Sequence, residues 1–291
     1  MSFRSPAELQ AEAQGVLNSI DPATMKNKDR LKIPQQDMPS QDPRDRRGNM
    51  EEVTYGYFEE QALVEAERCL QCKNAPCIKG CPVAIDIPGF IKAITERDYA
   101  KSLAVIKETS LLPAICGRVC PQENQCQEYC TVGKSLKDIF KSVSIGRLER
   151  YVADWGAEHA DGASPTVKPA TGKKVGVIGS GPASITAAAD IRREGHEVTL
   201  FEAFHKPGGV MIYGIPEFRL PKRIVGDEIK TLEAMGVEIK TNYLVGRTRK
   251  LRDLVEKDGY DAIFIGTGAG LPKFMSIPGE NLVGVFAANE Y

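Results

Sequence analysis

All eight cysteines of the chain lie between Cys69 and Cys130, in two groups of four with short spacings. The first group is Cys69-x2-Cys72-x4-Cys77-x3-Cys81, and the second is Cys116-x3-Cys120-x5-Cys126-x3-Cys130. One cysteine in each group is followed directly by a proline, Pro82 or Pro121. Thiols packed this densely in a reducing compartment are more typical of metal ligands than of disulfides.

The spacing favours [4Fe–4S] clusters over zinc. Short cysteine spacings let one turn of backbone supply three corners of a cubane cluster, while a remote residue supplies the fourth. Here four residues separate Cys72 from Cys77, where bacterial ferredoxins have two. The chain therefore matches the arrangement of three local ligands and one remote ligand, but not the standard ferredoxin spacing. The alternative is a pair of all-cysteine zinc sites, but only Cys69 and Cys72 show the x2 knuckle. We therefore expect two clusters, and counting thiols alone would give Cys116 to the second.

A glycine turn is the second motif with chemical meaning. It reads Gly179-Ser180-Gly181-Pro182-Ala183, after an apolar predicted strand over 174–178 and before a predicted helix over 183–193. Gly179 permits the tight turn and Gly181 lets a pyrophosphate approach the backbone, while the helix N-terminus offers free N–H groups to the phosphates. Ser184 occupies the third position of the dinucleotide-binding motif, where Gly or Ala is usual. The pattern predicts a dinucleotide site.

An acidic residue supports that prediction. Glu202 follows Gly179 by 23 residues, at the end of a predicted strand over 197–201. A carboxylate there accepts hydrogen bonds from ribose hydroxyls and disfavours a 2′-phosphate, so we expect FAD or NAD rather than NADP in this turn.

A later glycine run, Gly266 to Gly270, follows a predicted strand over 261–265. Leu271 and Pro272 come next, so no helix begins there. We expect a strand-end loop that faces the nucleotide, with Gly268 among the cofactor-binding residues.

The elements that carry these motifs change character near residue 160. Before residue 160, helices are predicted over 51–70, 88–96, 99–108 and 144–155. After a polar stretch, a further helix is predicted over 222–235 and a strand over 237–240. The expected fold class is α plus α/β, an all-helical, ferredoxin-like two-cluster domain followed by a partial Rossmann-like FAD-binding domain. Its parts are an extended N-terminal arm (1–50), the helical iron–sulfur domain (51–160), a linker (161–173) and the Rossmann-like domain (174–291).

Composition excludes several function classes. A chain of 291 residues with 42% hydrophobic residues is expected to form about two domains. Its 38 basic and 39 acidic residues give a charge of −1, which favours neither nucleic acid nor an anionic membrane as a partner. No run approaches 18 apolar residues and the first residues lack the apolar core of a signal peptide, so we expect a cytoplasmic protein. No catalytic triad or carboxylate pair is expected.

Six segments resemble the small, or β, subunit of NADPH-dependent glutamate synthase and its relatives. They are RCLQC at 68–72, GCPVAIDIPGFI at 80–91, LPAICGRVCPQENQC at 112–126, GRLERYVADW at 146–155, GSGPAS at 179–184 and GGVMIYGIPEFRLPK at 208–222. NADH-dependent ferredoxin:NADP oxidoreductase, sulfide dehydrogenase and the N-terminal part of dihydropyrimidine dehydrogenase share the pattern. The motifs do not separate these relatives.

The resemblance implies two [4Fe–4S] clusters and an FAD that exchanges hydride with NADPH in the complete enzyme. One cluster would be held by Cys69, Cys72, Cys77 and Cys130, and the other by Cys81, Cys120, Cys126 and Glu149. Cys116 would then stay uncoordinated. The alternative for Glu149 is a charge pair along its helix. Gly208 and Gly209 are expected to bind the flavin cofactor as well.

The implied function is electron transfer from NADPH, through FAD and the clusters, to a larger catalytic subunit such as the glutamate synthase large chain. In the family a separate NADPH domain interrupts the flavin domain, and this sequence stops at Tyr291, about where that insertion is expected. We therefore expect the front half of such an enzyme. The alternative is a cluster-bearing docking fragment without catalytic activity of its own.

Overall fold

The computed structural model describes residues 3–159 and 166–287. The chain divides into two compact units, Met1–Ala163 with Glu217–Ile224 and Ser164–Pro216 with Val225–Tyr291. Part of the predicted linker, residues 161–165, lies outside the described residues. No helix among the described residues is long and apolar enough to cross a lipid bilayer.

The N-terminal residues pack onto the helical unit where composition alone predicts an extended arm. Helix α1 (Pro6–Ser19) begins with a capping box between Ser5 and Glu8. Its buried Leu9 and Ala13 face the helical unit, and Ala13 shares an apolar cluster with Val64. Apolar residues spaced four apart lie on one helix face, and that face is covered here. The short helix α2 (Asn27–Arg30) and the 3₁₀ turn η1 (Arg46–Gly48) follow.

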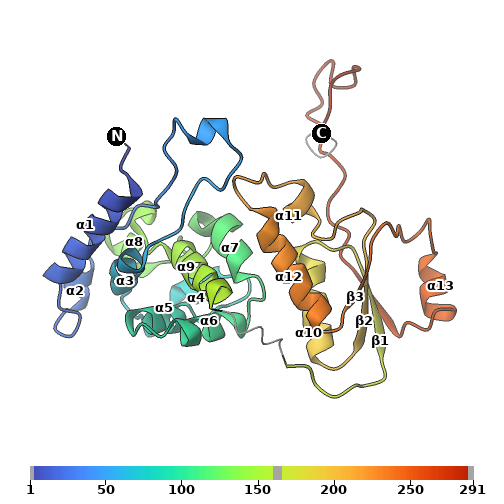
Figure 1. Cartoon of the computed structure of the whole chain (residues 1–291), viewed down its shortest axis with the longest axis horizontal. Helices are drawn as coiled ribbons and strands as arrows, with labels where there is room; N and C mark the ends of the chain where they lie inside the picture. Colours follow the sequence, from blue (N-terminus) through green and yellow to red (C-terminus); the bar gives the residue numbers. More distant parts are fainter. Residues whose placement is uncertain (1–2, 160–165, 288–291) are drawn as a thin grey trace. The chain divides into compact units, whose positions relative to one another are not determined.

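The cysteine-bearing region consists of short helices joined by turns (Figure 1). They are α3 (Glu59–Glu67), α4 (Pro76–Gly80), α5 (Ile87–Thr95), α6 (Tyr99–Lys107), α7 (Pro113–Val119), η2 (Gln122–Asn124), α8 (Thr131–Ser135), η3 (Ile139–Lys141) and α9 (Ile145–Glu158). The predicted helices over 88–96, 99–108 and 144–155 correspond to α5, α6 and α9. The helix predicted over 51–70 is shorter, because Gly56 has a φ of 89° and the helix begins only after Phe58.

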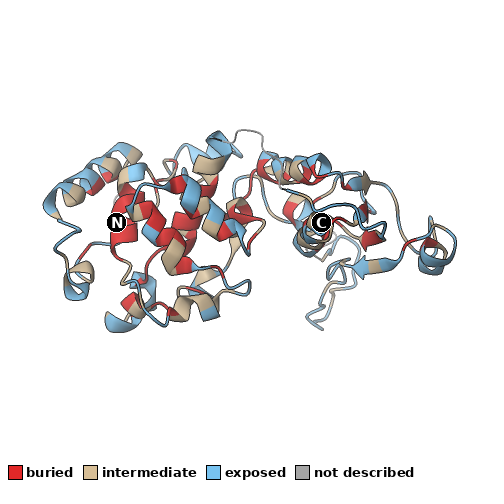
Figure 2. Cartoon of the chain, turned by 90° about the horizontal axis from the view of Figure 1, so that it is seen from below, coloured by how far each residue is buried: buried red, intermediate tan, exposed pale blue. Residues whose placement is uncertain are grey.

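The apolar core of this unit lies between α3, α5 and α9. Phe90, Ile91 and Ile94 of α5 and Leu148 and Val152 of α9 are completely buried in it. Figure 2 shows the buried residues gathered between the helices of this unit. The same cluster includes Cys126 and Cys130, with Cys69, Cys77 and Cys81 packed against it. The thiols are therefore held by the core rather than by mobile surface loops.

The second unit is built on a parallel sheet with strand order β3-β2-β1-β4. Its elements are β1 (Lys174–Ile178), α10 (Pro182–Arg193), β2 (Glu197–Phe201), α11 (Val210–Tyr213), α12 (Lys222–Ala234), β3 (Glu238–Lys240), α13 (Leu251–Glu256) and β4 (Ala262–Ile265). The predicted strands and the helices over 183–193 and 222–235 appear within one residue of their predicted ends. Helix α10 packs on β1 and β2, and Figure 1 shows α12 on the same side of the sheet and α13 on the other.

Candidate cofactor sites

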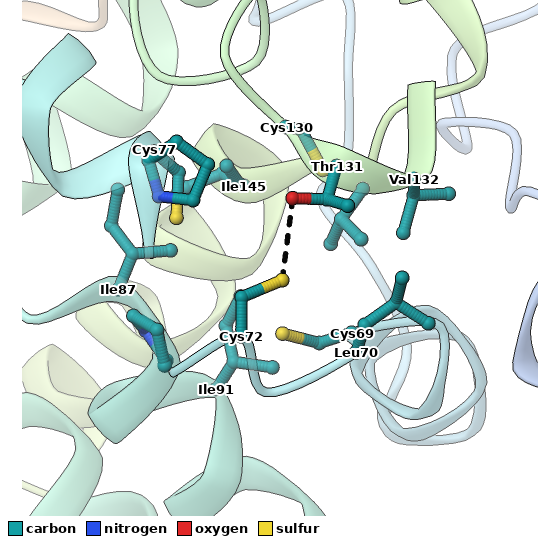
Figure 3. A pocket seen from close by; sticks show the side chains of 13 residues that line it. Cys69, Leu70, Cys72, Cys77, Ile87, Ile91, Cys130, Thr131, Val132 and Ile145 are labelled. Carbon is teal, nitrogen blue, oxygen red and sulfur yellow. Dashed lines mark hydrogen bonds between the residues drawn. The ribbon is translucent and has the colours of Figure 1, made fainter. Parts of the chain in front are cut away.

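Four cysteines from separate parts of the chain line one cavity in the helical unit. Cys69 follows α3, Cys72 and Cys77 lie in the next turn and in α4, and Cys130 caps the N-terminus of α8. Ile87, Ile91, Val132 and Ile145 supply apolar walls (Figure 3). Soft thiolate ligands in an apolar surround suit a metal–sulfur cluster. We call this cavity the four-thiol site.

Burial raises the pKa of two of these thiols, Cys69 and Cys77. Burial, with Cys130 and Cys72 nearby, raises the pKa of Cys69 to about 11. The pKa of Cys77 rises to about 12 for the same reason, with Cys130 and Cys69 as its nearest thiol neighbours. Ligation requires thiolates, so metal binding here must release protons.

Two polar side chains touch sulfurs of the four-thiol site. The Cys72 Sγ and the Thr131 Oγ1 are hydrogen-bonded at 3.3 Å, as Figure 3 shows. The Gln71 Nε2 donates to the Cys69 Sγ at 3.5 Å and to the Pro88 carbonyl at 3.1 Å.

The remaining thiols gather around Glu149. Burial, together with the nearby Cys120, raises the pKa of Glu149 to about 8. Burial also raises the pKa of Cys126 to about 12, with Glu149 and then Cys81 as further causes. Cys81, Cys120, Cys126 and Glu149 thus share one neighbourhood, here called the carboxylate site.

Glu149 has an unsatisfied oxygen in this neighbourhood. Its Oε1 is buried and has no hydrogen-bond partner within the described part of the chain. The side chain is 6% exposed and forms no ion pair with any described residue, so the helix charge pair considered from the sequence is not found. A buried carboxylate oxygen without a partner is costly, and an iron ion would satisfy it.

Cys116 lies in the same neighbourhood. The neighbouring Cys120, and then burial, raise the pKa of Cys116, while the neighbouring Cys116 lowers the pKa of Cys120 to about 7. Cys116 also lies close enough to Glu149 for the carboxylate to raise its pKa further. The structure therefore brings both sequence candidates for the fourth ligand near Cys120.

Sequence reasoning missed the contacts that place Glu149. A Cβ on Gly117 would lie 2.6 Å from the backbone nitrogen of Arg150, so α7 approaches α9 closely only because residue 117 is glycine. Arg118 then binds Asp154 of α9 in bidentate fashion, at 2.8 and 2.9 Å, and Glu52 at 2.7 Å. These contacts hold the last helical turn of α7 and its C-cap, from Cys116 to Cys120, beside Glu149.

Among the described residues, no three His, Cys, Asp or Glu side chains converge closely enough to hold one metal ion. Tetrahedral zinc would place its sulfurs about 3.8 Å apart, given Zn–S bonds of ~2.3 Å. A cubane cluster is larger and accepts ligands that lie farther apart.

The glycine turn of the second unit lies between β1 and α10 as predicted. Gly179 has a φ of 94°, and a Cβ there would lie 2.4 Å from the Gly266 carbonyl oxygen. Gly181 caps α10 with a φ of −69°, and a Cβ there would meet nothing within 4 Å. Gly179 is therefore needed by the fold, whereas Gly181 leaves space at the helix N-terminus that fits a phosphate. Pro182 and Ala183 are the exposed first residues of α10.

Glu202 and the next glycine pair adjoin this turn. The Ser180 hydroxyl donates to Glu202, and the Phe204 backbone N–H donates to the other Glu202 oxygen at 2.7 Å. The Gly208 N–H donates to the Ser180 Oγ at 2.8 Å, and a Cβ on Gly209 would lie 2.9 Å from the Gly181 Cα. Five of the predicted cofactor-binding residues thus lie together: Ser180, Gly181, Glu202, Gly208 and Gly209. Residues 266–270 form the predicted strand-end loop, in which Gly268 is exposed with a φ of 74°.

Two protein families match separate segments of the chain. Residues 46–161 match the family described as dihydropyrimidine dehydrogenase domain II, 4Fe-4S cluster. Residues 173–290 match the family described as pyridine nucleotide-disulphide oxidoreductase. The chain thus carries one segment that is similar to an iron–sulfur family and a second segment that is similar to a pyridine-nucleotide oxidoreductase family.

The curated relatives confirm the resemblance to glutamate synthase small chains. The chain is 36% identical to the glutamate synthase [NADPH] small chain of Escherichia coli K12, over 81% of this chain and 49% of that protein. It is 34% identical to the corresponding chain of Azospirillum brasilense, over 88% of this chain and 52% of that protein. It is 38% identical to the NAD-dependent dihydropyrimidine dehydrogenase subunit PreT of E. coli K12, over 77% of this chain and 54% of that protein.

The chain therefore spans about half the length of the curated relatives it matches. Among solved structures, Mycobacterium tuberculosis FprA in complex with NADPH aligns with a TM-score of 0.37 and 28% identity, over 42% of this chain and 28% of that one.

Proposed function

We propose that this chain is part of an iron–sulfur flavoprotein oxidoreductase that passes electrons from NADPH, through FAD and two [4Fe–4S] clusters, to a larger partner subunit. The observation that carries the proposal is the separation of the thiols into two neighbourhoods, one of which surrounds the unpartnered Oε1 of Glu149. In this proposal the helical unit is a ferredoxin-like two-cluster domain and the sheet unit is part of a Rossmann-like FAD-binding domain.

The ligand sets follow from the neighbourhoods. Cys69, Cys72, Cys77 and Cys130 hold one cluster in the four-thiol site. Cys81, Cys120, Cys126 and Glu149 hold the other, and Cys116 lies near Cys120 without binding iron. The chain's own task is to exclude water, to supply thiolates from buried thiols and to tune the potentials.

The glycine turn binds the flavin cofactor. The N-terminus of α10 beyond Gly181 faces the pyrophosphate, and Glu202 accepts hydrogen bonds from the ribose hydroxyls in exchange for its contact with Ser180. When bound, FAD supplies two-electron hydride chemistry with NADPH and one-electron chemistry with the clusters. Gly208, Gly209 and Gly268 lie in the loops assigned to this cofactor.

The partner is a larger catalytic oxidoreductase subunit, for which the glutamate synthase large chain is the first candidate. This rests on the names of the relatives, which include small chains of glutamate synthase. A dihydropyrimidine dehydrogenase type of assembly is the second candidate, because PreT matches about equally well. A cytoplasmic location stays a prediction.

The test is anaerobic purification of the 291-residue chain with iron and sulfide analysis. We expect about eight irons per chain and a matching amount of acid-labile sulfide, as two cubane clusters require. Stoichiometric zinc without iron after anaerobic reconstitution would contradict the proposal. NADPH:dye reductase activity of the chain alone separates a self-sufficient enzyme from a cluster-bearing docking fragment.

A further inference from the structure

The hydrogen bond between Cys72 and Thr131 joins two segments that are far apart in sequence. Thr131 directly follows Cys130 and is the first residue of α8, so the same backbone that presents the Cys130 thiol also presents the Thr131 hydroxyl. Val132, the next residue, is 1% exposed and anchors this segment in the core. The position of the hydroxyl relative to Cys72 is therefore fixed by buried packing.

The direction of this bond depends on the state of the thiol. A free Cys72 thiol can donate its proton to the Thr131 oxygen, but a thiolate that binds iron has no proton and can only accept. A hydroxyl can both donate and accept, so the same 3.3 Å contact persists with the Thr131 O–H as the donor. Among the described residues, the structure gives the Thr131 hydroxyl no hydrogen-bond partner other than Cys72.

We propose that Thr131 is a positioning residue that raises the reduction potential of the cluster in the four-thiol site, by donating a hydrogen bond to the Cys72 sulfur. The inference rests on the proposed function, because it requires a cluster at that site. A one-electron reduction adds negative charge to the cluster and its sulfurs, and no bond forms or breaks. A fixed donor stabilises the more negative state, so it favours reduction.

The two sites differ in this respect. At the carboxylate site one of the four proposed ligands is an oxygen, that of Glu149. At the four-thiol site the donors are a hydroxyl on Cys72 and the Gln71 amide on Cys69. The proposal therefore separates the potentials of the two clusters, with Thr131 acting on the four-thiol cluster alone.

The experiment is a dithionite titration, followed by EPR, of the whole chain reconstituted with ferrous iron and sulfide. Thr131→Val removes the hydroxyl at nearly constant shape. We expect it to keep the iron content and to lower the reduced-to-oxidised ratio of one cluster about tenfold at fixed potential, which is 59 mV for a one-electron couple. Thr131→Ser should retain the parent midpoint. Thr95→Val is the matched control, since the Thr95 hydroxyl bonds the Lys92 carbonyl rather than a sulfur.

The outcomes separate this inference from the proposed function. A parent protein without iron overturns both. If Thr131→Val keeps its full iron content and its reduced-to-oxidised ratio at fixed potential stays within twofold of the parent ratio, the inference alone is overturned. A twofold change in that ratio is a midpoint shift of roughly 18 mV. If Thr131→Val loses iron, Thr131→Ala is titrated in its place. Loss of iron in both variants would make Thr131 a structural requirement and would also overturn the tuning role.

Discussion

The thiol sites of the helical unit and the glycine turn of the sheet unit are built in opposite ways. The four-thiol site needs Cys130 to meet three cysteines from another part of the chain, and the carboxylate site needs Glu149 of α9 to meet thiols from α4, α7 and the turn after η2. The glycine turn is formed by consecutive residues between one strand and one helix. A local motif is largely specified by its own backbone preferences, whereas a convergent site depends on the packing of the whole unit.

The difference predicts how far the effect of a substitution should extend through each unit. A lost thiol in a convergent site removes a cross-link between distant segments as well as a ligand. A lost contact in the glycine turn should lower the affinity for one cofactor while the sheet stays folded. The predictions below test this contrast from the largest expected effect to the smallest.

Replacing Cys130 should have the largest effect. Cys130→Ser removes the ligand that closes the four-thiol site from a distance, and we expect iron to fall from about eight to about four per chain. Because metal binding is coupled to folding, the thermal midpoint of the helical unit should fall as well. Iron analysis and calorimetry under anaerobic conditions measure both. Unchanged iron content would show that Cys130 is not a ligand.

The carboxylate site gives the next test, in which Glu149 and Cys116 compete for one corner. Glu149→Ala should lose or convert one cluster, and Glu149→Cys should restore it with a different EPR signal, because a thiolate replaces a harder oxygen ligand. Cys116→Ser should keep both clusters. The opposite pattern, with iron near four in Cys116→Ser and near eight in Glu149→Ala, would assign the corner to the thiol.

Two glycines of the turn separate folding from binding. Gly179→Ala forces a side chain into a positive φ and against the Gly266 carbonyl, so we expect a loss of at least about 2 kcal/mol in stability. Gly181→Ala should change stability by less than about 0.5 kcal/mol, because its backbone and surroundings admit a methyl group, yet flavin binding should weaken. Denaturant unfolding and flavin titration measure the two quantities. Equal effects on stability would remove the distinction drawn between these positions.

The smallest effect is expected at Glu202. Glu202→Ala should weaken flavin binding by roughly 1–3 kcal/mol, the scale of a charge-assisted hydrogen bond to a ribose hydroxyl. Iron content should stay at the parent value, since Glu202 lies in the unit without cysteines. Glu202→Gln is the control that keeps the shape and part of the hydrogen bonding. Flavin affinity unchanged in Glu202→Ala would show that this strand end does not contact the ribose.

Local sequence patterns predicted the sheet unit well. Strands β1 and β2 and helix α10 were predicted almost to the residue, because apolar runs bounded by glycine and a helix start are short-range signals. The short helices α4, α7, α8, α11 and α13 were not predicted. Each spans at most two turns, which is too short for a clear apolar period, and tertiary contacts stabilise such segments.

The sequence by itself determined that eight clustered thiols and one glycine turn would dominate the chemistry, since residue types and short spacings are read directly from the chain. Only the tertiary structure decided that Thr131 would reach Cys72 and that the Oε1 of Glu149 would be buried with no hydrogen-bond partner among the described residues. Gly117 and the Arg118–Asp154 pair bring α7 against α9, and that approach joins residues from distant segments. Such placement depends on how the helices pack in the folded unit, which no local pattern of residues records.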